Sequence, residues 1–137
     1  LGGSGEVNLR HQGNLKLQTT SAGIRETGTV SDSKGDLRKI IHKQESSAYT
    51  LVAADAGKAI EIQGNITIPA NVFAGGDAVT LINDGGSDLT ISKGSGFNHL
   101  FNSADGNNAN RTLGGRGMAT IYFVNGTTGY ITGAGLS

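Results

Sequence analysis

The sequence lacks cysteine and tryptophan, has a single proline, and is poor in charge. Without cysteine, neither a disulfide framework nor a thiolate metal site can form. Charged residues make up 16% of the chain and are balanced at 11 basic and 11 acidic, which argues against the basic stripe that binds nucleic acid. No signal peptide and no apolar run near the roughly 18 residues of a membrane helix is recognisable. We therefore expect no nucleic-acid partner and no membrane insertion.

Glycine, by contrast, is abundant, with 23 residues in a chain of 137. This length allows one domain, or one domain with a short extension. Frequent glycine together with few helix formers favours short strands joined by tight turns, so the composition indicates an all-β protein.

Between Tyr49 and Ser92 apolar and polar residues alternate in short bursts, each closed by Gly, Asn or Asp. A period of two predicts half-buried strands, and the turn residues between the bursts predict hairpins. One hairpin is expected to join residues 60–62 to 66–68, and a second to join 79–81 to 89–91. Before them, the Ala-rich stretch 51–58 predicts one helical turn that ends on a left-handed glycine.

The C-terminal stretch adds a strand from Met118 to Val124, a hairpin turn at Asn125-Gly126, and a returning strand from Gly129 to Thr132. We expect residues 37–137 to form a β-sandwich of about eight strands, jelly-roll-like in class. Its predicted core consists of the inward-facing residues of these strands: Ile60, Ile62, Ile66, Ile68, Val79, Leu81, Leu89, Ile91, Ile121 and Phe123.

Three shorter bursts between Glu6 and Val30 predict strands that lead into a polar linker ending at Asp36. The apolar side chains of this segment are too few to offset the entropy of ordering it alone. Residues 1–36 are therefore expected to bury their apolar face against copies of the same chain; the alternative is a disordered leader. Because the chain opens without methionine, we expect a piece of a longer protein or a tag remnant.

The first third of the chain resembles the short repeat found along bacteriophage tail fibres. The residues that carry this likeness are GNLKLQTT at 13–20, GI at 23–24 and TG at 27–28. Where the family has aromatic residues, this chain has Arg10 and His11, so the match there is partial.

The remainder is similar to the C-terminal domain of such fibres. The shared elements, in order, are SKGDLR at 33–38, YTL at 49–51, DAGK at 55–58, TIP at 67–69 and GAG at 133–135. The resemblance implies the distal, receptor-binding part of a homotrimeric fibre, whose N-terminal strands intertwine. It also implies a virion protein that acts outside cells, joined to other tail proteins through a preceding part.

Catalytic and metal-binding patterns are weak. Glycoside hydrolysis needs two converging carboxylates, whereas Asp77, Asp84, Asp88 and Asp105 all lie in Gly-rich turns, where aspartate commonly bonds locally. The three histidines are far apart and lack zinc spacing, although a trimer axis would gather three copies of one. The calcium-like stretch 102–107 lacks its terminal Glu. We expect no enzyme activity, no catalytic residue, no metal and no cofactor.

The long Gly- and Asn-rich stretch between residues 97 and 111 has chemistry suited to sugar hydroxyls. Amides, an imidazole and a guanidinium offer hydrogen bonds with little net charge to desolvate, while Phe97, Leu100 and Phe101 are better explained as core. The expected receptor-binding residues, for a host glycan or lipopolysaccharide, are Asn98, His99, Asn102, Asn107, Asn108 and Arg111. Two alternatives remain open: a purely structural fibre segment, and a carbohydrate-binding module that belongs to no virion.

Overall fold

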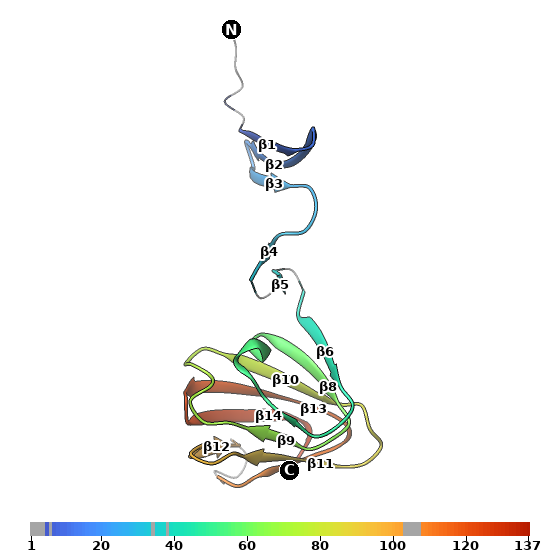
Figure 1. The fold of residues 1–137 in the computed structure, drawn as a ribbon, viewed down its shortest axis with the longest axis vertical. Coiled ribbons are helices and arrows are strands. Elements are labelled where there is room, and N and C mark those ends of the chain that lie inside the picture. Colours follow the sequence, from blue (N-terminus) through green and yellow to red (C-terminus); the bar gives the residue numbers. More distant parts are fainter. Residues whose placement is uncertain (1–4, 6, 34, 38, 103–107) are drawn as a thin grey trace. The chain divides into compact units, whose positions relative to one another are not determined.

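The computed structural model describes the chain except for residues 1–4, 6, 34, 38 and 103–107. It divides into two units, Leu1–Lys39 and Ile40–Ser137 (Figure 1), which we call unit 1 and unit 2. The division falls three residues after the boundary predicted at Asp36, so the polar linker belongs to unit 1.

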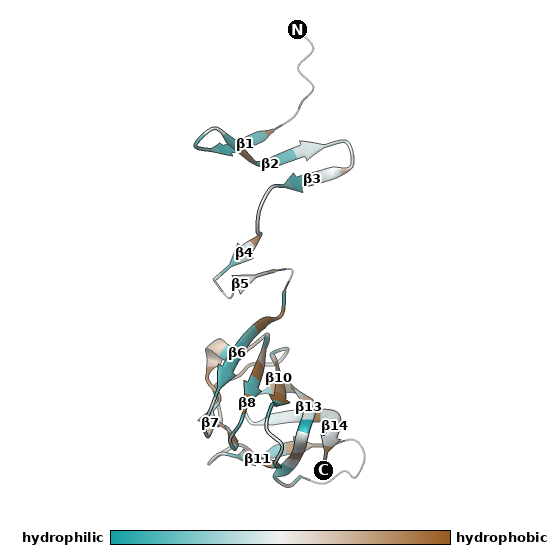
Figure 2. Cartoon of the chain, turned by 90° about the vertical axis from the view of Figure 1, so that its right-hand side faces the viewer, coloured by the Kyte–Doolittle hydropathy of each residue, from teal (hydrophilic) through white to brown (hydrophobic). Residues whose placement is uncertain are grey.

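Unit 1 consists of short antiparallel strands, as the alternation predicts. β1 (Asn8–His11), β2 (Asn14–Thr20) and β3 (Gly23–Glu26) form one sheet, and β4 (Ser31–Asp32) pairs with β5 (Gly35–Asp36). None of the side chains that the structure describes in this unit is buried. In Figure 2, β1 to β3 are mostly hydrophilic, whereas β10 of unit 2 is largely hydrophobic.

In the residues that the structure describes, unit 2 is all-β apart from one turn of 3-10 helix, η1. The described residues form η1 at Ala53–Asp55, and Gly57 follows it with a φ of 79°, which confirms the predicted helical turn and its left-handed glycine. The strands are β6 (Ile41–Glu45), β7 (Tyr49–Thr50), β8 (Lys58–Ile62), β9 (Ile66–Ile68), β10 (Ala78–Asn83), β11 (Leu89–Lys93), β12 (His99–Phe101), β13 (Arg111–Asn125) and β14 (Thr128–Leu136).

The first six strands of unit 2 follow a coil of three turns. β6, β8 and β10 pair in parallel in one layer, and β7, β9 and β11 pair in parallel in a second layer. The two hairpins predicted at 60–68 and 79–91 are therefore wrong, because the strands of each presumed hairpin lie in different layers. The layers are those of the expected sandwich, but parallel pairing is not the connectivity of a jelly roll.

The corners of the coil explain why the hairpin prediction failed. Gly64 lies against the preceding corner, where a Cβ would be 2.4 Å from the backbone nitrogen of Ala48. A tight turn rich in Gly and Asn serves a corner between layers as well as it serves a hairpin. The local sequence specifies the turn, whereas the pairing partner depends on residues some 20 positions away.

β13 closes the coil by pairing with both layers. Its first residues pair with β11 and its later residues with β10, so the strand crosses between layers at Gly114–Gly117, where Arg116 has a φ of 63°. The buried amide of Asn83 fixes this bend by donating to the carbonyls of Leu113 and Gly114, both at 3.0 Å. The predicted hairpin at Asn125-Gly126 is confirmed, because β14 returns antiparallel along β13.

The predicted all-β, two-layered class and its core are confirmed. All ten residues expected inside are buried, together with Phe97 and Leu100 from the stretch before and within β12. Phe123 lies at the aromatic centre, stacked on Phe73 at 4.2 Å between ring centroids and met edge-on by Phe97 at 6.2 Å.

The first turn of the coil is closed by polar residues, which we call the polar cap: Lys43, Glu45, Tyr49 and Asp55. The carboxylate of Asp55 is fully buried and accepts hydrogen bonds from Lys43 Nζ at 3.1 Å, the Tyr49 hydroxyl at 2.9 Å and the Val52 backbone N–H at 2.9 Å. Coiled β structures need such polar ends, because a further apolar turn would expose the core or recruit another chain.

Electrostatics hold the polar cap in one protonation state. Burial lowers the pKa of Lys43, but hydrogen bonds with Tyr49, Glu45 and Asp55 outweigh burial and raise it above its ordinary value. Burial, followed by the effect of the Asp55 carboxylate, raises the pKa of Tyr49. At neutral pH Lys43 is therefore an ammonium ion and Tyr49 a neutral phenol.

Candidate functional site

The long connection between β11 and β13 is anchored by Lys93, the last residue of β11. Its ammonium group donates to the backbone carbonyl of Asn98 at 3.1 Å and to that of Asn108 at 2.8 Å, and it also donates to Asn108 Oδ1 at 3.2 Å. One side chain thus joins Asn98, which precedes β12, to Asn108, which follows it. This role of Lys93 was not predicted from sequence, because nothing in its neighbours distinguishes it from a solvated charge.

Asn108 organises the same region from the other side. Its Oδ1 accepts from the Leu100 N–H at 2.7 Å, which fixes the orientation of the amide. Its Nδ2 then donates to the Asn98 carbonyl at 2.8 Å and to His99 Nδ1 at 3.0 Å. Because an amide nitrogen only donates, His99 accepts through Nδ1, and its Nε2 is left for solvent or a ligand.

Five of the six predicted receptor-binding residues fall into three groups. Asn98 and His99 are exposed and Asn102 is half-buried, so these three reach the surface. Asn108 uses both amide protons and both acceptor positions of its Oδ1 within the protein. Asn107 lies outside the described residues.

Arg111 requires a correction, because its side chain faces inward. It is only 3% exposed and donates from Nη2 to the Leu100 carbonyl at 3.3 Å. The cause is its position at the start of β13. Arg111 lies two residues before Leu113, so both side chains point to the inner side of the strand. Arg111 and Asn108 therefore shape the region, whereas Asn98, His99 and Asn102 contribute to its surface.

Aromatic rings continue this surface across β12 and β14. His99 stacks on Phe101 with 5.1 Å between ring centroids and 7° between planes, and Phe101 lies 5.4 Å from Tyr130 at 44°. Parallel pairing of β12 with β14 aligns Phe101 with Tyr130. Tyr130 was not singled out from sequence; its place beside β12 depends on a pairing between residues about 30 positions apart.

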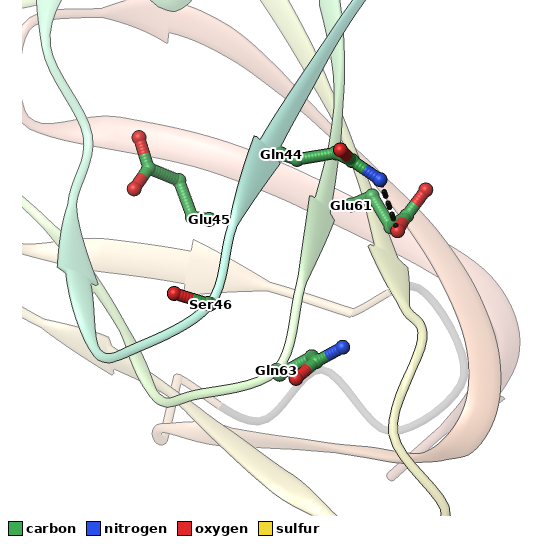
Figure 3. Close-up of a pocket in the computed structure, with 5 residues that line it drawn as sticks. All are labelled: Gln44, Glu45, Ser46, Glu61 and Gln63. Carbon is green, nitrogen blue, oxygen red and sulfur yellow. Dashed lines mark hydrogen bonds between the residues drawn. The ribbon is translucent and has the colours of Figure 1, made fainter.

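A second polar site is a hollow of about 160 Å³ on β6 and β8 (Figure 3), lined by Gln44, Glu45, Ser46, Glu61 and Gln63. Glu61 accepts from the Gln44 amide at 2.8 Å through one oxygen and from His42 Nε2 at 3.0 Å through the other. Figure 3 shows the Glu45 and Glu61 side chains directed to opposite sides of β6. Glycoside hydrolysis requires two carboxylates that flank one bond of the substrate. Glu45 and Glu61 do not face each other in this way.

Of the described aspartates in the Gly-rich turns, Asp77 bonds locally as predicted, whereas Asp84 and Asp88 bond to the distant bend of β13, so the local interpretation is wrong for these two. Asp77 accepts from the Ala74 N–H at 2.9 Å, Asp84 pairs with Arg116 at 2.8 Å, and Asp88 accepts from the Gly115 N–H at 3.3 Å. Asp105 and most of the calcium-like stretch lie outside the described residues.

Across the part of the chain that the structure describes, no group of three His, Asp or Glu side chains is placed to hold a metal ion. The same residues include no helix of the length and hydrophobicity that crossing a membrane requires. Comparisons with protein-family models, with curated proteins and with solved structures gave no match.

Proposed function

We propose that this chain is the distal, receptor-binding part of a bacteriophage tail fibre, which assembles as a homotrimer and binds a host glycan or lipopolysaccharide without cutting it. One observation carries the self-association: unit 1 forms five paired strands, yet none of its described side chains is buried. The fibre-like motifs of both units support the assignment to a virion.

Unit 1 needs a partner surface for energetic reasons. Val7, Leu9 and Ile24 are 54%, 57% and 73% exposed, and burying one such side chain contributes about 1.5–3 kcal/mol. A three-stranded sheet without a covered face is marginal in water. Other copies of the same chain carry the same exposed apolar side chains, so the copies can bury these side chains against one another, as in an intertwined fibre.

The receptor surface is assigned to Asn98, His99 and Asn102 in unit 2. The Asn98 amide and the free Nε2 of His99 match the donors and acceptors of sugar hydroxyls, and no ammonium or carboxylate among the three residues must be desolvated. Each site binds weakly, since sugar hydroxyls exchange water for protein partners. Three copies on one fibre end raise the avidity through effective concentration. The fibre joins other tail proteins through a part that precedes unit 1.

Light scattering tests the assembly. The full chain is expected at about three times its mass of 14.0 kDa, and removal of residues 1–30 should reduce that mass while the β-type circular dichroism of unit 2 remains. A chain that is monomeric with unit 1 intact contradicts the trimer.

Adsorption competition tests the receptor. Purified trimer should block phage adsorption to host cells, and Asn98→Ala with His99→Ala should remove that block without changing the mass. Ser87→Ala, at an exposed turn outside the surface, is the matched control and should retain it. A trimer that neither binds cells nor blocks adsorption supports the structural segment, a monomer that binds sugar supports the carbohydrate-binding module, and release of sugar fragments supports an enzyme.

A further inference from the structure

The outer side of β13 and β14 forms an uncharged surface that adjoins the proposed receptor residues where Phe101 meets Tyr130. We call it the tyrosine face and define it by Met118, Thr120, Tyr122, Tyr130 and Thr132. The two strands are antiparallel neighbours (Figure 1), with Tyr122 directly opposite Tyr130 and Thr120 opposite Thr132. Directly paired residues point to the same side of a sheet, so these side chains form one continuous layer.

Large apolar groups are open to solvent here. Met118 is 53% exposed, Tyr122 49% and Tyr130 50%. A shallow, mainly apolar hollow of about 200 Å³ lies among Tyr122, Tyr130 and the threonines. Contiguous exposed apolar surface of this kind marks a contact site in soluble proteins.

The tyrosine face also lacks charge over its whole length. From residue 118 to residue 134, the outward positions of β13 and β14 hold Met, Thr, Tyr, Val, Thr, Tyr, Thr and Ala. Cores of protein interfaces are depleted in charged residues and enriched in tyrosine and methionine. A surface without charge is complementary to another surface without charge, and a second copy of this chain supplies one.

The polar side-chain groups of this face are four hydroxyls, and one of them is bonded within the chain. The Thr120 hydroxyl bonds that of Thr80 on the adjacent β10 at 2.9 Å, and Phe101, beside Tyr130, has one ring face covered by His99. A sugar needs free donors and open ring faces, whereas an apolar protein surface requires that few polar groups lose their water. This composition favours a protein partner over a glycan.

We infer that the tyrosine face is the surface through which unit 2 contacts unit 2 of another copy of the chain. The inference rests on the self-association proposed for unit 1, which tethers several copies of unit 2 at high effective concentration. At this effective concentration, two copies of the tyrosine face bind each other even if their affinity is too low for unit 2 to assemble alone. The receptor residues Asn98 and Asn102 are not part of the face.

The absence of cysteine makes a single introduced thiol a clean probe. In the full chain, Thr132→Cys places a thiol on the tyrosine face, and Thr50→Cys places one at an exposed position of β7, the far end of the sheet order. In the assembled protein we expect maleimide to label Thr132→Cys at least about tenfold more slowly than Thr50→Cys, because reaction requires opening of the contact. Adding Tyr122→Lys to Thr132→Cys should restore fast labelling, since the ammonium cannot be buried there without a partner.

Light scattering on the same samples separates the outcomes. Slow labelling of Thr132→Cys in an oligomer, relieved by Tyr122→Lys, supports the contact. Equal labelling of both thiols in a confirmed oligomer overturns the inference while the self-association of unit 1 stands. A monomer overturns both. Fast labelling that slows only when host glycan is added overturns the contact and makes the tyrosine face a sugar site.

Discussion

Unit 1 and unit 2 share a sequence pattern but differ in what the pattern achieves. β2 has leucine at alternate positions, Leu15 and Leu17, and β10 has Val79 and Leu81 at alternate positions. The inward residues of β10 are fully buried, whereas those of β2 are only half-buried. Alternation therefore specifies a strand, but burial requires a second layer opposite it.

The second layer of unit 2 comes from the coil. Each strand is followed by a corner and then by a strand of the opposite layer, so apolar faces meet within one chain. Unit 1 turns back on itself through tight antiparallel connections and stays a single layer. The difference is one of connectivity, and it leads us to expect that unit 1 obtains its second layer from other copies.

The sharpest test replaces matched isoleucines in the two units. Ile62→Asp should lower the free energy of unfolding of unit 2 by roughly 5 kcal/mol or more, because a carboxylate replaces a fully buried side chain. Because that is comparable to the whole stability of a small domain, we expect loss of soluble, folded protein, measured by yield and circular dichroism.

Ile24→Asp is the control in unit 1, where this isoleucine is 73% exposed. It should leave the denaturant midpoint of unit 2 unchanged and lower the assembled mass. If Ile24→Asp unfolds unit 2 as well, the two units are not independent; if Ile62→Asp folds normally, the two-layered core is wrong.

The core was predictable because its signal is local. Ile60, Ile66 and the other eight predicted core positions each follow a period of two with turn residues on both sides, and all are buried. The partner of each strand was not predictable, since β8 pairs with β6 and β10 and not with β9, the next strand in sequence. A parallel partner leaves the same alternation as an antiparallel one.

The candidate site was predictable in composition but not in roles. The sequence located an Asn-rich polar region, and the exposed Asn98 and His99 fit it. It could not separate them from Asn108 and Arg111. The side chain of Arg111 faces inward because of its position at the start of β13, where it donates to the Leu100 carbonyl. The amide of Asn108 is held within the protein because it accepts from the Leu100 N–H. Tyr122 and Tyr130 were missed because their pairing is set by the register of the β13–β14 hairpin.

The polar cap offers a smaller effect, confined to unit 2. Asp55→Asn should lower the free energy of unfolding by about 3 kcal/mol, because it leaves the Lys43 ammonium without its buried partner. The Lys43 side chain is 27% exposed. Because solvent partly hydrates its ammonium group, the expected loss lies at the low end of the range for breaking a buried ion pair. Chemical denaturation measures it.

Asp88→Asn is the matched control for this change. Asp88 is exposed and accepts one long, solvent-exposed hydrogen bond, from the Gly115 N–H at 3.3 Å, so the same substitution there should shift stability by no more than about 0.5 kcal/mol. Equal effects at the two positions would mean that the cap does not close the coil.

The smallest expected effect is a loss of stability at alkaline pH that originates in the polar cap. The pKa values of Tyr49 and Lys43 both lie above their ordinary values of 10.0 and 10.5 in the folded chain. The folded state therefore keeps protons that the unfolded state releases, so stability is full below about pH 10 and falls as pH rises above it. Each group contributes a slope of at most about 1.4 kcal/mol per pH unit.

Tyr49→Phe isolates the phenol's share of this loss. It should flatten the fall in the free energy of unfolding between about pH 10 and 11, measured by denaturation at each pH, although it costs about 1 kcal/mol at pH 7 through the lost hydrogen bond to Asp55. Tyr130→Phe, at an exposed position outside the cap, should keep the contribution of Tyr49. Unit 1 contains no tyrosine. If the free energy of unfolding of Tyr49→Phe falls with pH as steeply as that of the unchanged chain, the alkaline loss of stability does not come from Tyr49. The polar cap would then not distinguish unit 2 from unit 1 in its response to pH.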